Sequence, residues 1–139
     1  MKKIILVESE PLQVSIYRRL FEKTDFDVEL AGGRNEMLEE LRDIRMGVSE
    51  KPDLVILDFM LADGQGIDVL RAIKKHALTK DIPVFAVTDY SNPHTDAEIH
   101  RNGIVPERYM IKAHHTPGQI LSAVNEYLNV MPGREAAIS

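Results

Sequence analysis

The residues best suited to chemistry are acidic, hydroxyl-bearing and cationic side chains that each come near the end of a short apolar run. The clearest is Asp58, which follows four consecutive apolar residues, Leu54–Leu57. A carboxylate in that position can attack phosphorus and form an acyl phosphate, provided that cations neutralise the incoming phosphoryl oxygens. The side chains of this kind are Glu8, Ser9, Glu10, Asp58, Thr88 and Lys112.

Three of these side chains would complete a site for phosphoryl transfer around Asp58. Lys112 could supply positive charge, and Thr88 could donate a hydroxyl hydrogen bond to a phosphoryl oxygen. Glu8 could help to hold Mg²⁺, which prefers oxygen ligands. Each residue alone has an ordinary structural explanation, since strand-end aspartates form turns and threonines favour strands. Their joint occurrence after four separate apolar runs favours a functional role.

The apolar runs have the length of β-strands and alternate with amphipathic stretches. Most runs are continuous, which is typical of strands buried on both faces of a parallel sheet. The repeated order predicts an α/β fold, a doubly wound five-stranded parallel sheet with the flavodoxin-like order 2-1-3-4-5. The expected strands are Lys3–Val7, Asp27–Ala31, Leu54–Asp58, Val84–Thr88 and Tyr109–Lys112, and the expected helices are Pro11–Lys23, Asn35–Met46, Gly66–His76, Pro93–Asn102 and Pro117–Val130.

This fold would bring the strand-end residues together. Ligands of doubly wound sheets bind beyond the carboxyl ends of the strands, at the point where the strand order reverses. Glu10 has a second interpretation, because it precedes Pro11 and its charge would interact favourably with the dipole of a helix beginning there. We favour this helix role for Glu10, and we expect Thr116 to cap the helix that begins at Pro117.

Length and composition limit the class of protein. The 139 residues suit one domain, over residues 1–130, followed by a flexible tail over 131–139. The chain has no cysteine, which excludes disulfides and thiolate metal sites and fits a cytoplasmic protein. A net charge of -5 without clustered Lys and Arg argues against direct nucleic-acid binding. No apolar stretch approaches the roughly 20 residues of a membrane span. No glycine-rich phosphate loop follows the first apolar run, and this argues against a flavin or nucleotide enzyme.

Several segments together carry a resemblance to a known family. They are Lys2–Val7 with acids following, Asp53–Leu61 with Asp63-Gly64, Thr88, and Tyr109–Lys112. With these segments the chain resembles the receiver domain of bacterial two-component response regulators, the CheY-like superfamily, over about residues 2 to 130.

The resemblance implies a function and a set of site residues. Asp58 would be the phosphoacceptor, supplied by a sensor histidine kinase, a phosphotransfer protein or a small phosphodonor. Thr88 and Lys112 would contact the phosphoryl group. Mg²⁺ would be held by Glu8, Asp58 and the backbone carbonyl of Met60. A protein of this kind is not an enzyme beyond its own phosphorylation and dephosphorylation.

The resemblance also implies a switch. Tyr109 matches an aromatic side chain that swings inward when the phosphate-sensing hydroxyl moves. This movement alters the face formed by the expected helix over 93–102, the strand over 109–112 and the helix over 117–130. That face is the usual binding surface for a downstream output protein.

Three residues depart from the family pattern. Ser9 stands where a second metal-binding acid is usual, so we expect Mg²⁺ to bind weakly. Asp89 stands where a small residue is usual and would repel a phosphoryl dianion. Ala113 replaces a proline that is joined by a cis bond; a trans bond is expected here, because a cis bond before alanine costs about 2.5 to 4 kcal/mol. These departures keep open an alternative, a phosphorylation-independent pseudo-receiver that acts as a protein-interaction module.

Overall fold

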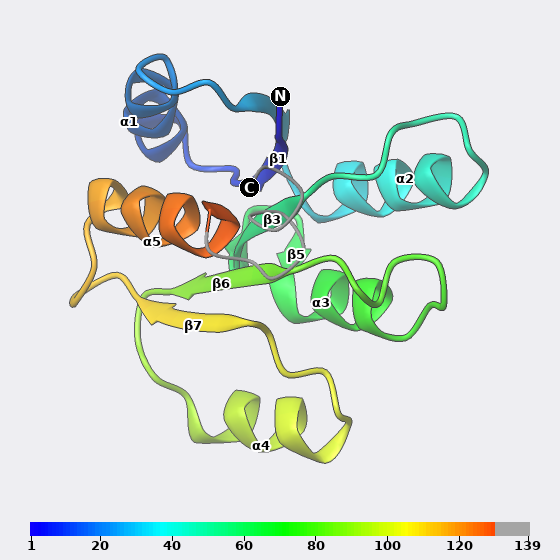
Figure 1. Ribbon diagram of the computed structural model, residues 1–139. Coiled ribbons are helices and arrows are strands. Elements are labelled where there is room, and N and C mark those ends of the chain that lie inside the picture. Colours follow the sequence, from blue (N-terminus) through cyan, green and yellow to red (C-terminus); the bar gives the residue numbers. More distant parts are fainter. Residues whose placement is uncertain (130–139) are drawn as a thin grey trace.

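The five apolar runs form one parallel sheet in the computed structural model, which describes residues 1–129 (Figure 1). The strand order is β2-β1-β3-β6-β7, with β4 and β5 in a separate hairpin, so the predicted flavodoxin-like order is confirmed. Every residue of β3 and β6 is buried, which explains their lack of polar alternation. The strands of the sheet are β1 (Lys3–Val7), β2 (Asp27–Ala31), β3 (Leu54–Asp58), β6 (Val84–Thr88) and β7 (Arg108–Ile111).

Helices cover both faces of the sheet (Figure 1). Side chains of α1 and α5 join one apolar cluster, and those of α2, α3 and α4 join the other. Burial of each large aliphatic side chain stabilises the fold by about 1.5 to 3 kcal/mol, so the two clusters supply most of the favourable free energy. The helices are α1 (Pro11–Phe21), α2 (Arg34–Arg45), α3 (Gly66–Lys74), α4 (Pro93–Arg101) and α5 (Pro117–Asn129).

The helices begin and end close to the predicted positions. Helix α1 ends at Phe21 instead of Lys23, because the carbonyl of Phe21 accepts hydrogen bonds from both the backbone N–H and the hydroxyl of Thr24. Helix α3 ends two residues before its predicted end, and helix α4 ends one residue before its predicted end. The expected cap of α5 is confirmed, since Thr116 Oγ1 accepts from the backbone N–H of Gln119 at 3.1 Å. The predicted helix end at residue 130 and the tail over 131–139 lie outside the described residues.

Strand β7 lies one residue earlier than predicted. Arg108 already pairs with Phe85 of β6, and the strand ends at Ile111. Lys112 therefore lies just beyond the strand, where its backbone N–H donates to the carbonyl of Thr88 at 2.8 Å. The peptide bond between Lys112 and Ala113 is trans, as expected, and no cis bond occurs in residues 1–129.

A short hairpin that was not predicted links β3 to α3. Its strands β4 (Met60–Leu61) and β5 (Gly64–Gln65) pair antiparallel. Gly64 has φ +159°, and a Cβ atom there would collide with the side chain of Arg34. The hairpin thus passes against the first residue of α2, a close approach that a glycine permits.

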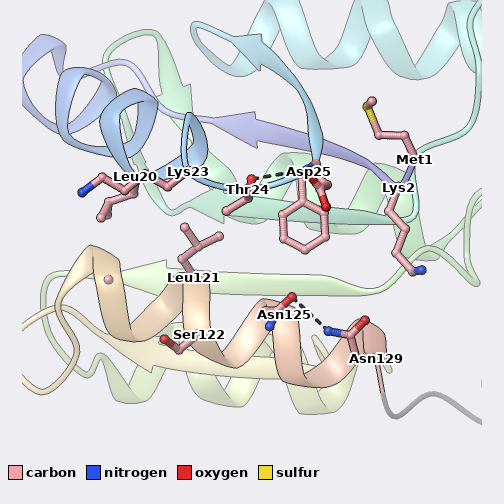
Figure 2. A pocket seen from close by; sticks show the side chains of 12 residues that line it. Met1, Lys2, Leu20, Lys23, Thr24, Asp25, Leu121, Ser122, Asn125 and Asn129 are labelled. Carbon is pink, nitrogen blue, oxygen red and sulfur yellow. Dashed lines mark hydrogen bonds between the residues drawn. The ribbon is translucent and has the colours of Figure 1, made fainter.

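A hollow of about 680 Å³ lies between α1 and α5 (Figure 2). Leu20 and Thr24 line it from the α1 side, and Leu121, Asn125 and Asn129 line it from α5. None of the strand-end residues with predicted chemistry borders this hollow. In the described part of the chain, no helix combines the length and apolar character that crossing a membrane requires.

Candidate functional site

The pairing of the parallel strands brings the predicted site residues to one edge of the sheet. Leu57 lies opposite Val7 of β1, and Asp58 lies opposite Val87 of β6. Thr88 in turn lies opposite Ile111 of β7. Glu8, Asp58, Thr88 and Lys112 therefore occupy neighbouring positions at the carboxyl ends of four adjacent strands, as predicted.

Asp58 is buried, and both of its carboxylate oxygens are hydrogen-bonded. Oδ1 accepts from the backbone N–H of Met60 at 2.7 Å, and Oδ2 accepts from Nζ of Lys112 at 2.6 Å. The side chain of Asp58 is 3% exposed and that of Lys112 is 26% exposed, so the pair lies at the inner wall of a partly open site. The carboxylate is held in one orientation beside a cation, which is the arrangement an anionic reactant requires.

Glu8 is a second buried carboxyl group beside Asp58. Its Oε2 accepts from the backbone N–H groups of Ser9 at 3.1 Å and of Glu10 at 3.2 Å. Burial, and then the neighbouring Asp58, raise the pKa of Glu8 to about 7. Burial lowers the pKa of Lys112, but Asp58, Glu8 and Asp89 more than offset this effect, so the net pKa is raised.

These contacts test whether a divalent cation fits the site. Asp58 is close enough to disfavour the charged form of Glu8, and one ammonium group, that of Lys112, contacts Asp58. Mg²⁺ prefers carboxylate and carbonyl oxygens and would relieve this repulsion. The residues present therefore fit the ion, with two carboxylates as charged ligands.

Ser9 and Glu10 both have defined structural partners. Ser9 Oγ accepts a hydrogen bond from the backbone N–H of Ala62, at 2.9 Å, and so ties the β1–α1 loop to the hairpin. The carboxylate of Glu10 accepts from the backbone N–H groups of Leu12 and Gln13 at 3.1 and 2.9 Å. The helix-capping interpretation of Glu10 is confirmed, and this carboxylate is engaged away from Asp58.

Thr88 and Tyr109 lie beside the site, with the tyrosine turned inward. Thr88 is buried, and its hydroxyl donates to the carbonyl of Tyr90 at 3.2 Å. The ring of Tyr109 packs against Phe59, with centroids 5.5 Å apart. Its Oη and the Oδ1 of Asp96 are both buried, and neither makes a hydrogen bond of good geometry among the described residues, although the Asp96 carboxylate is close enough to interact with the tyrosine. Burial, and then the charge of Asp96, raise the pKa of Tyr109 to about 12.

A cavity of about 330 Å³ opens between the hairpin and the start of α4. Thr88, Tyr109 and Met60 line it, together with Tyr90 and Asn92. Movement of the Thr88 hydroxyl or the Tyr109 ring would change the volume of this space. The two residues with a predicted switching role thus share one cavity next to Asp58.

Asp63 has a structural role that the sequence did not indicate. Its carboxylate accepts from the backbone N–H groups of Arg34 and Asn35, at 2.7 and 3.0 Å, and these bonds lower its pKa. Helix α2 therefore begins at Arg34, one residue earlier than predicted. Gly33, which precedes the helix, has no side chain that could cap it. This missing cap indicates that a residue elsewhere in the chain must accept from the first N–H groups of the helix.

Comparison with known proteins yields one consistent group of matches. The family model described as the response regulator receiver domain matches residues 4–125. The polar-differentiation response regulator DivK of Brucella anthropi is 26% identical over 127 residues, covering 91% of this chain and 96% of that protein. The phosphorylated cyanobacterial phytochrome response regulator RcpA superposes with TM-score 0.76 at 25% identity, covering 91% of this chain and 92% of that chain. A CheY-like receiver domain from Methanospirillum hungatei gives TM-score 0.74 at 22% identity, with 93% and 94% covered.

Proposed function

Because this chain belongs to the response regulator receiver domain family of two-component systems, we propose that it is a phosphorylation-dependent switch with Asp58 as its phosphoacceptor. The observation that carries the proposal is the buried Asp58 carboxylate, 2.6 Å from the ammonium of Lys112 and beside the carboxyl group of Glu8. Receiver domains are generally not enzymes in the strict sense. The chemistry proposed here is confined to phosphorylation and dephosphorylation of Asp58.

In the proposed reaction, a carboxylate oxygen of Asp58 attacks the phosphorus of the donor. A phosphorus–oxygen bond to Asp58 forms, the bond between phosphorus and the donor breaks, and the donor leaves with the bonding electron pair. The backbone N–H of Met60 holds Oδ1 in place, while Oδ2 lies on the Lys112 side. The ammonium of Lys112 can then transfer its contact from the carboxylate to a phosphoryl oxygen.

A divalent cation completes the proposed site, and phosphorylation and Mg²⁺ are standard for this family. Glu8, Asp58 and the backbone carbonyl of Met60 would hold the ion, which would supply positive charge against the phosphoryl oxygens. Ser9 contributes no charge, and its hydroxyl is already bonded to Ala62. We therefore propose that Mg²⁺ binds more weakly than it would at a site with a third carboxylate.

We further propose that Thr88 and Tyr109 transmit phosphorylation to the surface. The hydroxyl of Thr88, now on the Tyr90 carbonyl, would turn toward a phosphoryl oxygen, and the Tyr109 ring would respond in the adjoining cavity. The face altered would be that of α4, β7 and α5, which would bind the output protein. A sensor histidine kinase or phosphotransfer protein in the cytoplasm would supply the phosphoryl group, without direct nucleic-acid or membrane contact.

The alternative, a pseudo-receiver that signals without phosphorylation, has specific support in this chain. Ser9 removes a charged metal ligand, and Asp89 places a carboxylate 3.4 Å from Lys112. A protein-interaction module could retain the same fold and binding face. Modification of Asp58 separates the two functions directly.

The deciding experiment is intact-mass measurement after incubation with acetyl phosphate, with and without Mg²⁺. The wild-type protein should gain one phosphoryl mass in a metal-dependent manner, and the Asp58→Asn variant should not. A wild-type protein that gains no mass from acetyl phosphate or from a phosphorylated histidine donor would support the pseudo-receiver.

A further inference from the structure

Asp89 lies next to Lys112 because of the strand register. Strands β6 and β7 run parallel with Thr88 opposite Ile111, so the residues that follow them, Asp89 and Lys112, also lie opposite one another. The backbone N–H of Lys112 donates to the carbonyl of Thr88 at 2.8 Å, which holds the two strand ends together. Oδ1 of Asp89 lies 3.4 Å from Nζ of Lys112 as a result.

Lys112 is therefore shared between two carboxylates. Its Nζ lies 2.6 Å from Oδ2 of Asp58 and 3.4 Å from Oδ1 of Asp89. The Asp58 side chain is 3% exposed, whereas that of Asp89 is 49% exposed. Asp89 is thus the more exposed of the two carboxylates, and a phosphodonor that arrives from solvent at Lys112 would meet its charge.

A phosphoryl group on Asp58 would need the same ammonium group. It brings between one and two negative charges, and these would lie close to the Asp89 carboxylate. In this partly open site with one lysine, the Asp89 carboxylate would repel the incoming phosphoryl group. It would also neutralise part of the positive charge of Lys112, on which that group depends.

We propose that Asp89 competes with the phosphoryl group for Lys112, and thereby slows phosphorylation of Asp58. This inference rests on the proposed function of Asp58. Asp89 acts through Lys112, so it is a positioning residue and takes no part in bond formation. With acetyl phosphate as donor, the bond from phosphorus to Asp58 forms, the bond from phosphorus to the acetate oxygen breaks, and acetate leaves with the electron pair.

The test compares phosphorylation rates measured by intact mass with acetyl phosphate and Mg²⁺. The Asp89→Asn variant should be phosphorylated about 3- to 10-fold faster than the wild type at low ionic strength. The difference should shrink at high salt, because salt screens an exposed charge. Asp89→Glu should remain slow, since it restores the charge. Asp81→Asn is the control for an equal change in net charge. Asp81 is an exposed aspartate that precedes β6, whereas Asp89 follows the same strand at its other end.

The outcomes separate this proposal from the proposed function. If Asp89→Asn reacts at the wild-type rate while Asp58→Asn stays unmodified, the role of Asp89 is wrong and Asp58 remains the phosphoacceptor. An acceleration that is equal at low and high salt, or that Asp89→Glu shares, would be structural and would also overturn the proposal. If neither the wild type nor Asp89→Asn gains a phosphoryl mass from acetyl phosphate or from a phosphorylated histidine donor, the proposed function itself fails and the inference fails with it.

Discussion

The buried carboxyl group of Glu8 should make the metal-free protein less stable as the pH rises from about 5 to about 8. Burial, and then Asp58, raise its pKa from 4.5 to about 7. Between these values the folded protein retains a proton that the unfolded chain releases. Linkage then requires the free energy of unfolding to fall as the pH rises through the folded-state pKa.

The size of the effect follows from the shift of the pKa. One pKa unit corresponds to about 1.4 kcal/mol, so the full shift would correspond to about 3 kcal/mol. Water at the open side of the site screens this interaction, and we therefore expect a loss of about 1 to 2 kcal/mol. Glu8→Gln keeps the shape and removes the titration. Near pH 8 it should be more stable than the wild type by that amount, and near pH 5 the two proteins should be similar.

Urea unfolding followed by circular dichroism, in EDTA and at several pH values, measures this difference. Subtracting the wild-type curve from the variant curve removes the contribution of other titrating groups that the two proteins share. Glu126→Gln, at an exposed position of α5, is the matched control and should show no pH-dependent difference of this size. A Glu8→Gln difference that stays constant from about pH 5 to about pH 8 would refute the reasoning.

Three further outcomes are expected. Gly66→Ala should destabilise the protein by about 1 to 3 kcal/mol in urea unfolding, because a Cβ atom there would collide with the backbone carbonyl of Asp58. Gly118→Ala, whose Cβ would meet nothing closer than 3.8 Å, should be neutral or stabilising, and an equal loss in both variants would contradict this explanation. Ser9→Asp should lower the Kd for Mg²⁺ by about 10-fold in calorimetric titration, through a third carboxylate; an unchanged Kd would show that this position does not reach the ion. Tyr109→Phe removes a buried hydroxyl that is not at hydrogen-bond geometry with its polar neighbour Asp96, and should stabilise the protein by about 1 kcal/mol in thermal unfolding; a clear loss would show that the hydroxyl does bond to Asp96.

The strands were predictable from the sequence because both faces of the sheet are covered. Continuous apolar runs such as Leu54–Asp58 and Val84–Thr88 have the same bounds in the structure as in the prediction. Strand β7 was predicted one residue late because Arg108, at the edge of the sheet, is exposed and breaks the apolar pattern. Patterns of hydrophobicity report burial, and they lose accuracy where a strand lies at an edge.

The hairpin and the side-chain contacts of the site were less predictable. Met60–Leu61 and Gly64–Gln65 are too short for a periodic signal, and the carboxylate of Asp63 bonds to α2 from 28 and 29 residues away. The strand-end position of Asp58 is visible in the sequence. Its bond to Lys112 depends on the parallel register of β3, β6 and β7, which a pattern along the chain does not contain.

Helix α4 is the most weakly anchored helix on its side of the sheet. Within the described residues it buries one side chain, Ile99, whereas α3 buries five of its residues. Burial of a single isoleucine contributes about 2 kcal/mol, and the surface ion pair between Arg71 and Glu98 adds little. Local opening should therefore detach α4 long before the sheet unfolds, and native-state hydrogen exchange should show its amides among the earliest to exchange. The proposed binding face includes this loosely held helix, so a free-energy change of only a few kcal/mol at the proposed phosphoacceptor would be enough to remodel it.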